Sequence, residues 1–189
     1  MNFLGSFFRK NKPKKSKYLP KKKETLEISF VKKFTSNGGK FIYCENEEEL
    51  NLSFQNILFE NQITSSDLFS NETSISEYFQ INNENFNSIG LVMNCEFLIS
   101  DQGCIMVSNR QILNKKLNQL PKILIVVAKT SDFRNDVSEA MSSIRNKYGK
   151  SIPLNITNIH PTSSEKKSNF VSYKRISKEL YLLLRDFNK

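Results

Sequence analysis

The sequence has 189 residues, enough for one domain with a sizeable hydrophobic core but hardly for two. The formal net charge is +9, yet residues 1–23 hold nine Lys and Arg side chains and no acid, so the other 19 basic residues are balanced by 19 acidic ones. This distribution argues against a basic nucleic-acid-binding domain, and no apolar run reaches the roughly 18 residues of a membrane-spanning helix.

Residues 1–23 are predicted to form a basic tail ahead of the folded domain. Their lysine density, with Pro13 and Pro20, disfavours stable packing, so the first interpretation is a solvated extension. An alternative starts from four apolar residues on one helical face: Phe3, Leu4, Phe7 and Phe8. With the cations they would give a weak peripheral contact with an anionic membrane, at about 1 kcal/mol per basic residue. Nucleic-acid binding by the tail is a third alternative, which we do not expect.

The first elements of the folded part are two helices with a strand between them. The first helix passes through Ile28 and Phe34 and stops at residues 37–39, Asn-Gly-Gly, after which residues 40–44 are typical of a strand. Asn46 is predicted to cap the second helix, since three glutamates follow it in the first turn. The buried stripe of this helix consists of Leu50, Phe54, Ile57 and Leu58.

The middle of the chain predicts a hairpin. Residues 62–87 give only a weak pattern, with one short strand and one short helix. Residues 97–99 and 104–107 are short apolar strands, and the turn at 100–103, Ser-Asp-Gln-Gly, contains residue types that tolerate positive φ. These residues therefore predict a strand, turn, strand unit.

A strand, helix, strand unit is predicted next. The six consecutive apolar residues 123–128 are typical of a strand buried on both faces of a parallel sheet. Ser131 or Asp132 is expected to cap the helix and Gly149 to end it, and residues 154–159 then form a strand after a right-handed parallel crossover. The apolar face of the helix comprises Phe133, Val137, Ala140, Met141, Ile144 and Tyr148.

Four short patterns, in order, resemble a known family. They are Ile89-Gly90, the hairpin at 97–103, Leu120-Pro121 and the apolar end strand within 179–186. Over residues 26–187 the chain is similar to the LutC/YkgG family of lactate-utilisation proteins, which carry a LUD domain. The resemblance implies one α/β domain over residues 24–189. Its mostly parallel sheet flanked by helices would be similar to the fold of sugar-phosphate isomerases and CoA-transferases, the NagB/RpiA/CoA-transferase-like fold.

The same resemblance implies a function. We expect a cytoplasmic accessory or regulatory component of the oxidation of L-lactate to pyruvate, acting beside iron-sulfur partner proteins. An independent catalytic activity is not expected, and neither is a cofactor or metal of its own. A small carboxylate is the expected type of ligand. The tail interpretation adds the inner membrane surface as an alternative location.

Candidate site residues come from the family's motif positions. Asp101 and Gly103 keep the outer positions of the family's turn, while Gln102 replaces its hydroxyl residue. Asp101 is the candidate acid or base for an alternative activity of the isomerase or CoA-transferase type, and turn geometry is its simpler explanation. His160 and Thr162 stand at the Gly and the last Ser of the family's Ser-Gly-Pro-Ser segment, and Ser163 follows this segment. The ligand-binding candidates are Asp101, Gln102, Gly103, His160, Thr162 and Ser163.

The positions of the glycines and cysteines argue against two kinds of site, a phosphate-binding loop and a cysteine-ligated metal centre. No glycine follows Gly149, so the last loops of the chain are a poor backbone cradle for a phosphate, and the common nucleotide fingerprints are absent. The three cysteines, at 44, 95 and 104, lie in apolar settings and form no C-x-x-C pair. They are therefore expected to be buried small hydrophobic residues rather than ligands of zinc or an iron-sulfur cluster.

Overall fold

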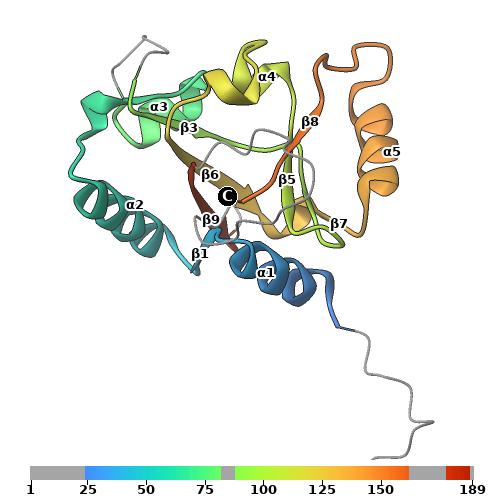
Figure 1. The fold of residues 1–189 in the computed structure, drawn as a ribbon, viewed down its shortest axis with the longest axis horizontal. Helices are drawn as coiled ribbons and strands as arrows, with labels where there is room; N and C mark the ends of the chain where they lie inside the picture. Colours follow the sequence, from blue (N-terminus) through green and yellow to red (C-terminus); the bar gives the residue numbers. More distant parts are fainter. Residues whose placement is uncertain (1–23, 82–87, 162–177, 188–189) are drawn as a thin grey trace, which may run out of the picture.

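The computed structural model describes residues 24–81, 88–161 and 178–187. The tail predicted at residues 1–23 lies outside the described residues, as do the candidate site residues Thr162 and Ser163. Within the described part, strands form two sheets, one of five strands and one of four. Figure 1 shows these sheets between α2 (Glu47–Asn61) on one side of the molecule and α5 (Val137–Tyr148) on the other.

The five-stranded sheet is parallel throughout, as the resemblance implied. Its order is β1 (Lys40–Cys44), β9 (Glu179–Arg185), β6 (Ile123–Lys129), β3 (Gly90–Met93) and β2 (Leu68–Phe69). The central strand β6 buries Leu124 and Val126 in one core and Ile123 and Ile125 in another, because successive side chains point to opposite faces. Its run of apolar residues therefore reflects a strand covered on both sides, which confirms the prediction.

The second sheet is mixed and runs β7 (Phe133–Arg134), β4 (Phe97–Ile99), β5 (Cys104–Val107) and β8 (Thr157–Ile159). Strands β4 and β5 form the predicted antiparallel hairpin, with Leu98 opposite Ile105. One face of this sheet shares a core with the parallel sheet. The other face packs against α5 through Ala140 and Ile144.

The helices cover the remaining faces. Helix α2 packs on the outer face of the parallel sheet, and its predicted cap is confirmed, since the Asn46 side chain accepts a hydrogen bond from the Glu49 N–H at 2.9 Å. The other α-helices are α1 (Leu26–Ser36), α3 (Thr73–Tyr78) and α4 (Asn109–Ile112), and single 3₁₀ turns occur at Ser65–Asp67, Leu117–Gln119 and Thr130–Asp132.

Two predicted features are wrong. Residues 130–132 form a 3₁₀ turn and Phe133 enters β7, so α5 begins later, with Asp136 as its cap. The segment after α5 does not form a parallel neighbour of β6, because β3 and β9 already occupy both edges of that strand. The strand predicted at residues 154–159 is observed only as β8, Thr157–Ile159. It pairs antiparallel with β5, on the side of the molecule where α5 lies.

The cysteines behave as expected. Cys44, Cys95 and Cys104 are buried and free, and burial raises the pKa of the Cys104 thiol to about 12. The hairpin register places Cys104 opposite Ile99, so Cys95 and Cys104 do not face each other across the strand pair.

Candidate functional site

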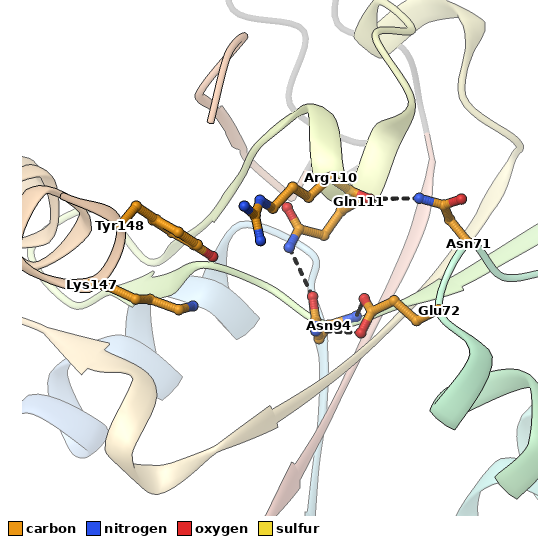
Figure 2. A pocket seen from close by; sticks show the side chains of 7 residues that line it. All are labelled: Asn71, Glu72, Asn94, Arg110, Gln111, Lys147 and Tyr148. Atoms are coloured by element: carbon orange, nitrogen blue, oxygen red, sulfur yellow. Dashed lines mark hydrogen bonds between the residues drawn. The ribbon is translucent and has the colours of Figure 1, made fainter. Parts of the chain in front are cut away.

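A polar cavity of about 350 Å³ lies where β2 and β3 end. The segments following these two strands supply Asn71, Glu72 and Asn94 to its wall. The start of α4 adds Arg110 and Gln111, and the last turn of α5 adds Lys147 and Tyr148 (Figure 2). The cavity thus lies at the carboxyl edge of the parallel sheet, the usual place for ligand sites in α/β folds.

The capping of α4 determines how its two cavity-lining side chains, Arg110 and Gln111, are exposed. Ser108 is the N-cap, and the Gln111 side chain accepts a hydrogen bond from the Ser108 N–H at 2.8 Å. This capping box holds Gln111 in a buried position, whereas Arg110 remains exposed at the mouth of the cavity. The Arg110 guanidinium lies over the Tyr148 ring, 4.4 Å from its centroid.

A buried carboxylate, Glu96, lies behind the cavity. Only 1% of Glu96 is exposed, and its carboxylate accepts hydrogen bonds from Ser108 Oγ and Tyr148 OH, both at 2.8 Å. The Lys147 ammonium lies 3.3 Å from the same group. Burial by itself would raise the pKa of Glu96, but the hydrogen bonds from Ser108 and Tyr148 and the charge of Lys147 outweigh it and lower the pKa. Glu96 is therefore an ionised anchor that holds α5 residues at the cavity.

A second carboxylate, Glu72, lies in the cavity wall itself. It accepts hydrogen bonds from the Asn94 backbone N–H at 3.0 Å and from the Asn94 side-chain amide. The carbonyl oxygen of the Asn94 side chain in turn accepts a hydrogen bond from Gln111 at 2.8 Å. Figure 2 shows this chain of three side chains on one side of the cavity, opposite Lys147 and Tyr148. Burial raises the pKa of Glu72.

The two cations of the site differ in how they are paired. Lys147 is paired with Glu96, whose charge and the Tyr148 hydrogen bond raise the pKa of Lys147 against the lowering effect of burial. None of the ion pairs among the described residues includes Arg110. A planar guanidinium of this kind suits a carboxylate, because its N–H groups can donate two parallel hydrogen bonds. The site is therefore suited to a small polar molecule that carries an anionic group.

The turn at residues 100–103, which supplied three of the predicted ligand-binding residues, is not part of the cavity wall. Asp101 and Gln102 are exposed at the tip of the β4–β5 hairpin, whereas Glu96 and Ser108 flank the open end of the same hairpin. Neither Asp101, Gln102 nor Gly103 lines the cavity. Their role as ligand-binding residues remains a prediction.

Gly103 has a clear structural role in that turn. Its φ is +61°, and a Cβ atom built at this position would lie 2.6 Å from the backbone nitrogen of Phe34 in α1. The Lys33 ammonium also donates a hydrogen bond to the Asp101 carbonyl at 2.7 Å. The turn thus needs glycine so that the hairpin can lie directly on α1.

His160 follows β8 and is exposed. It is not among the residues that line the cavity. Within residues 24–81, 88–161 and 178–187, no cluster of three or more His, Cys, Asp or Glu residues is arranged to hold a metal ion. In the same ranges no helix combines the length and the apolar character needed to cross a membrane.

Sequence reasoning missed every residue that lines the cavity except Tyr148, which it assigned to the apolar face of a helix. Two signals were available. Asn94 follows directly on the buried strand β3, which was not recognised as a strand, and Asn71 lies two residues after the end of the buried strand β2. Glu96 interrupts an apolar stretch, and an acid in such a setting is seldom buried without a partner.

Comparison with known proteins gives a family and a fold. The family model described as LUD domain matches residues 55–184. Among solved structures, the chain is similar to the crystal structure of a DUF162 family protein from Deinococcus radiodurans, with a TM-score of 0.59 and 12% sequence identity. That similarity covers 85% of this chain and 96% of the other, and at such low identity it shows the fold alone. No curated protein matches the sequence significantly.

Proposed function

Because this chain belongs to the LUD domain family, we propose that it acts in lactate utilisation as an accessory component without catalytic activity of its own. In this role it binds a small carboxylate and works beside separate iron-sulfur proteins that oxidise L-lactate to pyruvate. Family membership supports the pathway, and the cavity at the carboxyl edge of the parallel sheet supports the type of ligand.

The proposal rests mainly on Arg110, a cation of the cavity wall that forms no ion pair with the described residues. Its guanidinium lies on the Tyr148 ring at the cavity mouth, and no carboxylate of the described ranges forms an ion pair with it. A bound carboxylate would supply that missing partner. Lys147, held by Glu96, adds positive charge beside the same Tyr148 ring (Figure 2). The volume of about 350 Å³ accommodates a three-carbon acid with its water.

Isothermal titration calorimetry of the full chain with L-lactate and with pyruvate tests the proposal. Arg110→Gln removes the guanidinium, so the affinity for the bound acid should fall by about 10-fold to 100-fold, the loss of charge-assisted hydrogen bonds. Arg145→Gln is the matched control, because Arg145 is exposed on α5 and is not part of the cavity wall. If neither acid binds at millimolar concentration, or if both variants weaken binding equally, the proposal is wrong.

A further inference from the structure

Glu72 is a feature that a site for a simple anion would not need. It lines the same cavity as Arg110 and Lys147, and its negative charge opposes a ligand that is purely anionic. Each of its two carboxylate oxygens accepts one hydrogen bond from Asn94. A carboxylate oxygen has two lone pairs, so each oxygen keeps one further position for a donor.

Helix capping does not account for the Glu72 carboxylate. It occupies the N-cap position of α3, but its side chain makes no capping hydrogen bond there. None of the ion pairs of the described residues includes it, and the nearby Lys147 is already paired with Glu96. Asn94 and Gln111 instead hold the Glu72 carboxylate in the cavity wall, through a chain of hydrogen bonds that ends at Glu96. The arrangement is that of a positioned acceptor.

We propose that Glu72 selects ligands that carry a hydrogen-bond donor on the carbon next to the carboxylate, namely 2-hydroxy acids or 2-amino acids. The inference rests on the proposed function, since it assigns the ligand carboxylate to Arg110. Glu72 and Arg110 both line this one cavity of about 350 Å³, and the inference requires a small molecule that contacts both groups at once (Figure 2).

The chemistry of the neighbouring carbon decides the selection. A hydroxyl or an ammonium group donates a hydrogen bond to Glu72, and the ammonium adds charge attraction. A 2-oxo group has only lone pairs, so it faces the carboxylate without a hydrogen bond and with electrostatic repulsion. An unsubstituted acid leaves the acceptor unpaired. The site therefore ranks three-carbon acids by their substituent.

Calorimetry of the full chain with four acids that differ only at this carbon tests the inference. The probes are L-lactate, L-alanine, pyruvate and propionate. We expect lactate or alanine to bind at least about 10-fold more tightly than pyruvate and propionate, in keeping with the energy of a hydrogen bond to a charged group. The comparison of lactate with alanine tells which donor the site takes.

Two variants separate this inference from the proposed function. Glu72→Gln supplies an amide that can both donate and accept, so the ratio of affinities should fall towards one. Glu77→Gln, an exposed change of the same charge on the same helix, should keep the ratio. Equal binding of all four acids, or an unchanged ratio in Glu72→Gln while Arg110→Gln still weakens binding, would overturn the inference and leave the proposed function standing. If no acid binds, both fail.

The pH dependence gives a second readout. Burial raises the pKa of Glu72 and the charge of Glu96 raises it further, while the Asn94 N–H and the charge of Lys147 lower it, and the net direction is upward. As the pH falls through this raised value, Glu72 takes up a proton and ceases to be a charged acceptor. The preference for lactate or alanine should therefore decrease in the wild type as the pH is lowered from 7. It should not change in Glu72→Gln.

Discussion

The two ends of the β4–β5 hairpin are both polar, but their polar groups serve different purposes. At the turn, the chain rests on α1 through backbone groups, with the Asp101 carbonyl accepting from Lys33 and Gly103 in close contact with Phe34. At the open end, side chains converge on the buried carboxylate of Glu96, and a cavity of about 350 Å³ adjoins them.

This difference indicates which end of the hairpin is the better candidate for a ligand-binding site. A polar turn is required by backbone geometry alone, since positive φ and close approach favour small and polar residues. A polar group inside the core has no such reason, because its burial costs free energy unless partners compensate. The open end, where Glu96 is buried and Arg110 lacks an ionic partner among the described residues, is therefore the better candidate for ligand binding.

The largest effect is expected from Glu96→Ala. This change removes the acceptor of Ser108, Tyr148 and the half-exposed Lys147 from a buried position. Losing two hydrogen bonds to a charged group, at about 2 kcal/mol each, lowers the unfolding free energy by about 4 kcal/mol. Urea denaturation measures the loss, and binding of the small acid should vanish as well. Glu48→Ala, at an exposed position in the first turn of α2, is the control and should cost far less.

Glu96→Gln covers the case in which the Ala variant does not fold, because it keeps one acceptor oxygen. Hydrogen bonds and the Lys147 charge, acting against burial, lower the pKa of Glu96. The stabilisation is therefore complete above the unfolded-state pKa of about 4.3 and is lost as the pH falls through the folded-state value. Glu96→Gln should lose less stability in this acidic range than the wild type. A parallel decline of both would contradict the role of Glu96.

Gly103→Ala should have the next largest effect, and on stability alone. The added Cβ combines a positive φ with contact against α1, for an expected loss of about 3 kcal/mol. Gly149→Ala is the control for backbone conformation alone. Its φ of +56° and ψ of −116° disfavour a side chain, but no atom lies within 4 Å of the added Cβ, so it should lose about 2 kcal/mol. The affinity of the folded protein for a small acid should stay unchanged in both. A loss of binding in Gly103→Ala alone would assign the turn to the site.

Asp101→Asn should have the smallest effect. Its side chain is exposed, so we expect a change in unfolding free energy within about 0.5 kcal/mol and no change in ligand affinity. A turnover screen with acyl-CoA and sugar phosphates sharpens the result. If the wild type converts one of these substrates and Asp101→Asn abolishes that activity, the turn is an active site, and the chain is an enzyme of the isomerase or CoA-transferase type.

The sequence by itself determined most of the elements and the family. Strands β6 and β9 are continuous apolar runs, and Asn46 and Gly149 mark helix ends through local backbone requirements. Such signals lie within a few residues of the element they describe. These signals can therefore be recognised without knowing which elements the strand or helix packs against.

Only the tertiary structure decided the pairing of β8 and the composition of the cavity. Strand β8 joins β5 because both edges of β6 are filled by strands distant in sequence. The cavity collects Asn71 and Glu72, Asn94, Arg110 and Gln111, and Lys147 and Tyr148 from four segments that have no common spacing. The role of each of these side chains depends on which partners the fold brings within hydrogen-bond distance, and no local pattern in the sequence records that.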